Sequence, residues 1–302
     1  DKTSQEVGEK HMFERTPLFA ESWNVAWRRR PAGSLLEDRE TPFFVLRNSV
    51  RYWAADPFLF EYKGQRYVFA ELYDYIARKG VIGYCKWNGK CFGRWKKAIV
   101  EDYHLSYPYI FEHDGNVYIM PESGANRDLH VYRAVKFPGT WELSSVIREN
   151  VVYGDTTPFC WKQHIYALTY DVETSKDYKM ILLDLENGGK DYSIQADEPE
   201  LRRPAGKHFI YRGMHVRPAQ NCEGDYGKGL LLYQYSIEQG AYSEKLIAEM
   251  APKDLCYSKK MVLDGLHTYN ATDSFEVIDI KTRRLNLLNL ISRMIGKLRR
   301  VS

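Results

Sequence analysis

Alternating apolar and polar positions recur along this chain in a unit of about fifty residues. The stretches Ala55 to Glu71 ("ADPFLFEYKGQRYVFAE") and Ser106 to Glu122 ("SYPYIFEHDGNVYIMPE") align without a gap and share six of seventeen letters. In each stretch two alternating runs flank a turn that contains glycine, and the Asp114-Gly115 pair is a strong hairpin signal. Each copy therefore predicts a β-hairpin.

Weaker copies of the same pattern follow at similar spacing. They run from Asp155 to Tyr170, from Arg203 to Ala219 and from Gly265 to Ile280, and short strand candidates such as "VIGYCKW" and "GLLLYQYSI" lie between the copies. Five units of about four short strands predict an all-β fold, a five-bladed β-propeller. We expect the early strand Trp23 to Arg29 to complete the last blade. The alternative is a β-sandwich whose hairpins match by coincidence.

The periodicity changes after Ile280. Apolar residues then recur at helical spacing and the charges are all positive, which predicts a basic amphipathic helix over residues 281–302. It either packs on the propeller or a sister subunit, or contacts an anionic membrane surface through residues 283–300. The expected division is a flexible N-terminal segment, residues 1–20, in which "EKHMF" resembles a cloning remnant, then the propeller, residues 21–280, then the helix.

Composition narrows the functional classes. The 302 residues are 44% hydrophobic and 14% aromatic, enough for a large core with many strands, and the net charge of +3 shows no nucleic-acid footprint. Nucleic acid is therefore not an expected partner. Five cysteines without metal or disulfide spacing favour a reducing, cytoplasmic setting, and neither a membrane span nor a signal peptide is visible.

Equivalent positions of the repeat carry polar side chains that blade packing alone does not require. In a propeller, the entrances of the first strands and the ends of the second strands gather on one face of the ring. The first-strand entrances hold Asp56, Ser106 with Tyr107, Asp155, Arg203 and His267, and the second-strand ends hold Glu71, Glu122, Arg217 and Gln220. Such groups are costly to bury unless they pair or bind a polar ligand, so the repeat predicts a central polar pocket.

Several carboxylates around one pocket suit glycoside chemistry, in which one carboxylic acid protonates the leaving oxygen and a carboxylate activates water or attacks the anomeric carbon. The predicted catalytic residues are Asp56, Glu122 and Asp155. The predicted substrate-binding residues are Trp53, Glu71, Tyr107, Arg203, Arg217, Gln220, Asp225, Tyr226, Glu244 and His267. No metal site and no cofactor is predicted. The alternative is that these residues form turns and Asp/Arg pairs that only stabilise the ring.

Six segments in chain order resemble a known family: "WAADPFLF", "YVFAE", "HLSYPYIFEHDGNVYIMPES", "RRPAGKHF", "VRPAQNCEGDYG" and "GLHT". They resemble the propeller domain at the N-terminus of plant glucosamine inositolphosphorylceramide transferases, whose stand-alone or formyltransferase-linked bacterial relatives are associated with surface polysaccharide biosynthesis. The resemblance spans Trp23 to Asp279. It implies a five-bladed propeller and a glycosyltransferase or formyltransferase partner. The transferase chemistry of the plant proteins belongs to a separate domain, and this sequence contains no Asp-x-Asp motif.

More distantly, the chain is similar to the five-bladed glycoside hydrolases. That resemblance implies that Asp56 is the base or nucleophile and that Glu122 and Asp155 are the acid and a supporting carboxylate. Tyr107 departs from the pattern because it replaces an acid at the second-blade entrance.

Three hypotheses follow. The favoured one is a carbohydrate-active protein of surface glycan or polysaccharide metabolism, a glycoside hydrolase-like enzyme that acts on a glycosidic bond in the central pocket. The second is a non-catalytic module that binds a glycan or sugar phosphate and supports a biosynthetic enzyme. The third is a scaffold whose channel is sealed by salt bridges.

Overall fold

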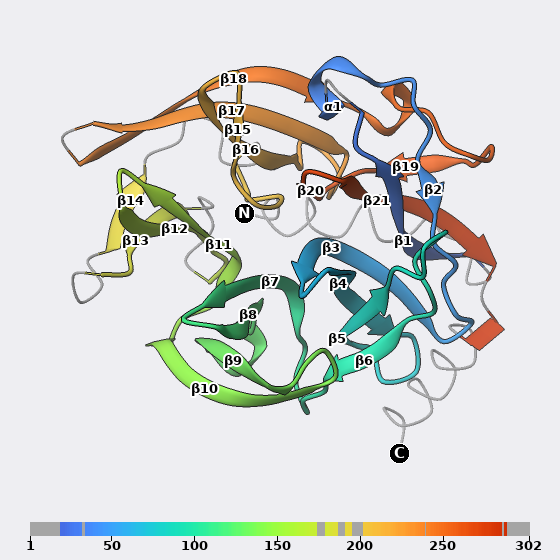
Figure 1. Cartoon of the computed structure of the whole chain (residues 1–302), viewed down its shortest axis with the longest axis horizontal. Helices are drawn as coiled ribbons and strands as arrows, with labels where there is room; N and C mark the ends of the chain where they lie inside the picture. Colours follow the sequence, from blue (N-terminus) through green and yellow to red (C-terminus); the bar gives the residue numbers. More distant parts are fainter. Residues whose placement is uncertain are drawn as a thin grey trace, which may run out of the picture.

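Each repeat of the sequence forms one antiparallel sheet in the computed structural model, and five such sheets surround a common axis (Figure 1). The five-bladed propeller predicted from the repeat is thereby confirmed. The structure describes residues 19–31, 34–173, 179–186, 191–194, 202–238, 240–285 and 287–288.

Four blades are built from consecutive strands, each paired with the next in order outward from the axis. The first contains β3 (Tyr52–Tyr62), β4 (Gln65–Asp74), β5 (Lys79–Lys86) and β6 (Lys96–Ile99). The second contains β7 (Ser106–His113), β8 (Asn116–Glu122), β9 (Asp128–Lys136) and β10 (Thr140–Glu149). The third contains β11 (Tyr153–Trp161), β12 (His164–Asp171), β13 (Lys179–Asp184) and β14 (Asp191–Ile194). The fourth contains β15 (Phe209–Tyr211), β16 (Met214–Asn221), β17 (Gly229–Glu238) and β18 (Ala241–Met250).

The fifth blade joins the two ends of the chain. It contains β19 (Leu263–Gly265), β20 (Tyr269–Ala271), β21 (Phe275–Leu285), β1 (Phe19–Arg29) and β2 (Phe44–Val45). Strands β1 and β21 pair along their whole length, which confirms that the early strand closes the ring. Inside this closure the fully buried Arg28 donates from Nε to Glu276 Oε2 at 2.7 Å.

The helical elements of the described residues are short. They are α1 (Ser34–Glu37), the 3-10 turns Gly124–Asn126 and Pro252–Asp254, and the two helical residues Leu287 and Leu288. Among the described residues no helix has the length and apolar character needed to cross a membrane. Residues 281–285, expected as the start of the amphipathic helix, belong to strand β21, and residues 287–288 are helical as expected. Residue 286 and residues 289–302 of that expected helix lie outside the described part of the chain.

The core consists of apolar side chains packed between neighbouring blades. One cluster joins the fifth and first blades around Trp27, Leu72 and Val277, and another joins the first and second blades around Phe58 and Ile119. Apolar residues fill the space between the blades, and several buried polar side chains, among them Asp56, Asp155 and His267, lie at the inner strand ends. This arrangement determines where the candidate site forms.

Candidate functional site at the propeller centre

The first three blades repeat one irregular turn of the backbone at the entrance of the inner strand. The strand register shifts between Ala55 and Phe58, and equivalent shifts occur in β7 and β11. The residue inside each bulge has a left-handed backbone, with φ of 51° for Asp56, 44° for Tyr107 and 50° for Asp155. Non-glycine residues adopt this conformation at a cost, and such strain gathers at functional sites. The bulge explains why these three residues project from the strands toward the axis.

The backbone N–H of each bulge residue donates to a carboxylate. Asp56 N donates to Asp279 Oδ2 at 2.9 Å, and Tyr107 N donates to Asp56 Oδ2 at 3.3 Å. Asp155 N donates to Glu122 Oε2 at 3.0 Å. Each bond joins neighbouring blades, so the strained turns also hold the acidic side chains in fixed positions.

Glu122 and Asp155 form one half of the cluster and share Arg203. The guanidinium Nη2 lies 3.5 Å from Glu122 Oε2, and Nε pairs with Asp155 Oδ2. Gln220 Nε2 also donates to Asp155 Oδ2 at 2.9 Å. Burial and the neighbouring Asp155 raise the pKa of Glu122 to about 8, although its side chain remains 21% exposed. Glu122 is therefore a partly accessible carboxyl group that keeps its proton at neutral pH.

Asp56 and Asp279 form the other half, with His267 between them. His267 Nδ1 lies 2.6 Å from Asp279 Oδ2, and Nε2 lies 3.6 Å from Asp56 Oδ1. Burial acts to lower the pKa of His267, but the two carboxylates outweigh it and the net shift is upward. Burial has the opposite effect on an acid: it raises the pKa of Asp56 to about 6, although the charge of His267 opposes that rise. The imidazole therefore acts as a counter-charge for two buried acids.

These three side chains are also the group whose geometry most resembles a metal site. Their ligand atoms lie within 4.8 Å of one another. A metal needs a free lone pair on a neutral imidazole, whereas both nitrogens of His267 face carboxylate oxygens and its pKa is raised. The residues present therefore fit a protonated histidine better than a bound cation.

Glu71 adds a fifth acid to the centre. Burial, and after it the charges of Asp56 and Glu122, raise the pKa of Glu71 well above its usual range. His104 Nδ1 accepts the N–H of Gly80 at 2.8 Å, which leaves Nε2 as the protonated nitrogen, 3.6 Å from Glu71 Oε1. The centre thus contains carboxyl groups in both protonation states.

Aromatic rings cover one side of the cluster. Trp23 stacks on His267 with ring centroids 3.9 Å apart, and Tyr226 contacts the same imidazole edge-on at 5.3 Å. The Arg203 guanidinium lies 5.4 Å from the centre of the Tyr226 ring, which is 42% exposed. Lys281 Nζ holds this loop by contacts to the Tyr226 carbonyl at 2.6 Å and to Asp225 at 3.0 Å. Tyr226 therefore offers an accessible aromatic surface beside Glu122 and Arg203, which suits a sugar ring.

Two further predicted residues lie near the axis in different roles. Tyr107 is fully buried, and its hydroxyl contacts Thr157 Oγ1 at 2.7 Å and accepts the Gly206 N–H at 2.7 Å. It therefore links the second, third and fourth blades. Trp53 of β3 stacks on Tyr73 of β4 with ring centroids 4.8 Å apart. These two residues are opposite one another in the ladder, two positions away from the pair Ala55 and Glu71.

Arg217 and Glu244 pair with one another. Arg217, which has no exposed surface, donates from Nε to Glu244 Oε2 at 2.6 Å and from Nη2 to Glu244 Oε1 at 2.9 Å. Arg202 also contacts Glu244 Oε1 at 2.6 Å. This pair joins β16 to β18. The residue of β16 that contacts the acidic cluster is Gln220, which donates to Asp155.

Sequence reasoning missed Asp279, Trp23, Thr268 and Lys281. Thr268 Oγ1 donates to Asp56 Oδ1 at 3.1 Å, and Asp279 Oδ1 accepts the backbone N–H groups of His267 and Thr268. Asp279 had a detectable signal, because it is the second-strand end of the fifth repeat and corresponds to Glu71 and Glu122. The contribution of Trp23 depends on the closure of the ring and has no local signal.

The raised pKa of Glu122 predicts a stability cost at neutral pH. The unfolded carboxyl, with a pKa near 4.5, must take up a proton on folding, so this cost is absent below about pH 4.5 and grows until about pH 8. Glu122→Gln removes the titration and keeps an oxygen for Asp155 N–H. We expect the variant to melt a few degrees above the wild type at pH 8 and to match it at pH 4.5. The melting temperature changes by about 2–4 °C for each kcal/mol in the free energy of unfolding. Scanning calorimetry at both pH values measures this, and an equal offset at both would contradict it.

Comparison with solved structures shows the class of fold. The chain is similar to the catalytic domain of a Coprinopsis cinerea alpha-L-arabinofuranosidase of glycoside hydrolase family 62, with a TM-score of 0.56 at 10% identity over 86% of this chain and 98% of that one. It is also similar to a Bombyx mori beta-fructofuranosidase of family 32, with a TM-score of 0.52 at 12% identity over 75% of this chain and 55% of that one. At such identities the likeness defines the five-bladed fold alone.

Sequence comparison identifies the family. The profile of the N-terminal domain of glucosamine inositolphosphorylceramide transferase 1 matches residues 47–255, and the chain belongs to this family. The Arabidopsis thaliana transferase is 32% identical over 205 residues, and the Oryza sativa subsp. indica transferase is 29% identical over 193 residues. The matches cover 61% and 60% of this chain but only 25% and 26% of the relatives. The chain therefore spans about a quarter of the length of these transferases.

Proposed function

We propose that this protein binds a carbohydrate at the propeller centre and acts there on a glycosidic bond. Membership of a family named for a glucosamine transferase supports a carbohydrate-related function. The observation that carries the catalytic part is the pair of carboxyl groups that titrate on either side of neutrality, Asp56 at about 6 and Glu122 at about 8. Environments that push two such pKa values apart assign the base and the acid.

The proposed roles follow from this pair. Glu122 donates its proton to the leaving oxygen as the bond to the anomeric carbon breaks. Asp56 is ionised at neutral pH and accepts a proton from the attacking water, whose oxygen bonds to the same carbon. Arg203 and Gln220 keep Asp155 in place beside Glu122. Tyr226 contacts the sugar face.

A pH profile on an active substrate tests the proposal. A library of aryl glycosides is screened with the wild type, and kcat/KM is then measured across pH on the best substrate. We expect a bell-shaped profile with limbs near pH 6 and pH 8, because activity needs ionised Asp56 and protonated Glu122. In Asp56→Asn the acidic limb should disappear together with most of the activity. Turnover that survives unchanged in Asp56→Asn would contradict the proposed base.

A second function is favoured by the burial of the acids. Asp56 is 5% exposed and Asp155 2% exposed, and both already accept hydrogen bonds from the protein. A centre of this kind suits a module that binds a glycan or sugar phosphate through Arg203 and Tyr226 and serves a partner glycosyltransferase or formyltransferase. Ligand-induced thermal shifts on a glycan panel, with no turnover of any shifted ligand, would support this function over catalysis.

A further inference from the structure

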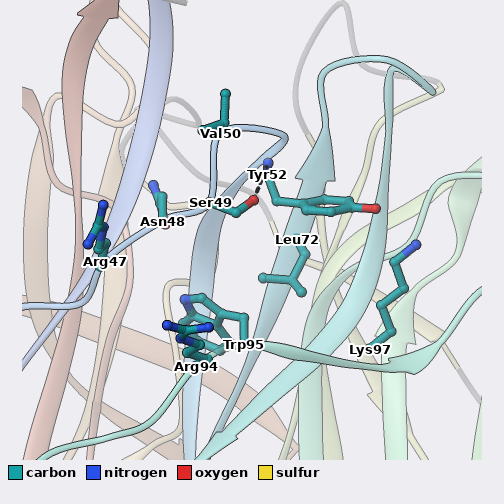
Figure 2. A pocket seen from close by; sticks show the side chains of 9 residues that line it. All are labelled: Arg47, Asn48, Ser49, Val50, Tyr52, Leu72, Arg94, Trp95 and Lys97. Atoms are coloured by element: carbon teal, nitrogen blue, oxygen red, sulfur yellow. Dashed lines mark hydrogen bonds between the residues drawn. The ribbon is translucent and has the colours of Figure 1, made fainter. Parts of the chain in front are cut away.

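A cavity lies beside the first blade, on the side that packs against the fifth blade, and none of the central carboxylates lines it. Its volume is about 580 Å³, and it is lined by nine residues from the start of β3 and the chain before it, from β4, and from β6 and the chain before it. We call it the basic pocket; its lining residues are Arg47, Asn48, Ser49, Val50, Tyr52, Leu72, Arg94, Trp95 and Lys97 (Figure 2). Leu72 follows Glu71 on β4 and packs into the core between the fifth and first blades. Because neighbouring residues of a strand face opposite sides, the basic pocket and Glu71 lie on opposite faces of the blade.

The lining of the basic pocket is positively charged. Arg47, Arg94 and Lys97 contribute three cations, and none of the nine lining residues is acidic. Figure 2 shows both arginines on one side of the cavity and Lys97 on the other, with Tyr52 and Leu72 between them. Guanidinium groups with free donors at one side of a cavity are suited to bidentate binding of a phosphate.

Two buried polar atoms of the basic pocket have no hydrogen-bond partner within the described part of the chain. They are the donor Trp95 Nε1 and the acceptor Asn48 Oδ1. Asn48 uses its amide nitrogen elsewhere, to the Trp23 carbonyl at 2.6 Å and Asn24 Oδ1 at 3.0 Å. Buried polar atoms are rarely left unsatisfied. Both atoms have almost no accessible surface, however, so the contacts to a ligand come from the cations and the rings of the lining and not from these two atoms.

Aromatic and aliphatic surface completes the lining. Trp95 and Tyr52 are half-buried and pack against the apolar core of which Leu72 is part. Lys97 Nζ lies 5.1 Å from the centre of the Tyr52 ring, so this cation stays close to the cavity. Ser49 Oγ accepts the Tyr52 N–H at 2.9 Å and fixes the turn that carries both residues. Flat apolar walls with cations at the rim suit a sugar ring bearing a phosphate, and the volume falls in the range of small-ligand sites.

We propose that the basic pocket binds a hydroxylated organic phosphate, with the phosphate on Arg47 and Arg94 and the sugar-like ring against Trp95 and Tyr52. This site is separate from the central cluster and does not depend on whether that cluster cleaves glycosides. The same chemistry is found in a free sugar phosphate and in the inositol phosphate headgroup of a lipid. Both sources are therefore included in the test.

Calorimetric titration with glucose 1-phosphate, inorganic phosphate and glucose tests the proposal. We expect glucose 1-phosphate to bind more tightly than either part alone. The double variant Arg47→Gln/Arg94→Gln should weaken that binding at least about tenfold, because it removes two charge-assisted contacts. The matched control Lys259→Gln/Lys260→Gln removes the same charge at exposed positions outside the pocket and should leave the affinity within about twofold.

The lipid source is tested by flotation with phosphatidylcholine vesicles, with and without phosphatidylinositol. Vesicle binding that needs phosphatidylinositol, Arg47 and Arg94 supports a headgroup, and titration by glucose 1-phosphate that needs the same arginines supports a soluble ligand. Equal weakening in the control variant would overturn the proposal. So would binding that is lost only in Arg203→Gln, which would place the phosphate at the centre, or the absence of binding to both probes. Trp95→Phe keeps an aromatic ring but reduces the flat surface of the wall, and its weaker binding would show that Trp95 contributes to the site.

Discussion

Glu122→Gln is expected to lower turnover of a glycoside substrate by roughly 100- to 10,000-fold at pH 7, the usual contribution of general acid catalysis. Its carboxyl carries a proton at neutral pH because burial and Asp155 raise its pKa to about 8, and its side chain is one of the accessible members of the cluster. An amide cannot give that proton to a leaving oxygen. Steady-state kinetics on the substrate found by the aryl glycoside screen measure the loss.

The kinetic effect can be separated from general damage to the protein. Glu112→Gln makes the same chemical change on an exposed position of β7 and should leave kcat/KM unchanged. Aryl glycosides with good leaving groups need less protonation, so their turnover should fall less than that of poor leaving groups. A uniform loss across leaving groups would indicate that Glu122 positions the substrate and is not the acid.

Glu244→Gln is expected to reduce the free energy of unfolding by about 3–5 kcal/mol, the cost of breaking a buried ion pair from one side. The change leaves Arg217, whose side chain has no exposed surface, without its counter-charge in the interior. Urea denaturation at pH 7 measures the difference. The matched control is Glu142→Gln, which breaks an Arg133 ion pair of the same 2.6 Å length whose side chains are about half exposed, and should cost less than about 1 kcal/mol.

The deficit of Glu244→Gln should depend on pH. Burial acts to raise the pKa of Glu244, but Arg217 outweighs it and the pKa falls to about 2, against 4.5 in the unfolded chain. The ion pair therefore stabilises the fold fully above about pH 4.5 and loses its contribution as the pH falls toward 2. If Glu244→Gln were as mild as Glu142→Gln at pH 7, Arg217 would have another acceptor and the pair would not determine stability.

The repeat made the fold predictable because each copy contains its own turn signal. Asp114-Gly115 connects β7 to β8 as the pattern indicated, and the strand from Trp23 to Arg29 closes the ring. The boundary after Ile280 was less predictable. The alternation of β21 continues to Leu285 through charged residues that also fit one face of a helix. Only the pairing with β1 shows that these residues form a strand and not a helix.

The candidate site was predictable where position in the repeat decides it. Asp56, Glu122, Asp155 and His267 do meet near the axis, joined by the contacts of Arg203, Gln220 and the bulged backbone. Arg217 shows the limit of such reasoning. Arg217 and Gln220 are three residues apart in β16, so their side chains lie on opposite faces of the blade. The partner of Arg217, Glu244, lies on another strand whose register no local pattern specifies.

The pairing of Phe19 with Leu285 brings the two ends of the ring to the same edge of one blade. If one polypeptide were joined before Phe19 and another after Leu285, the two would start from neighbouring points on the ring, as the two ends of an inserted domain do. The propeller can therefore be joined to other domains on either side without a break in any of the other four blades. A pull on the two ends would therefore act first on the β1–β21 ladder, at the pair of Phe19 and Leu285, before it reached the acidic centre.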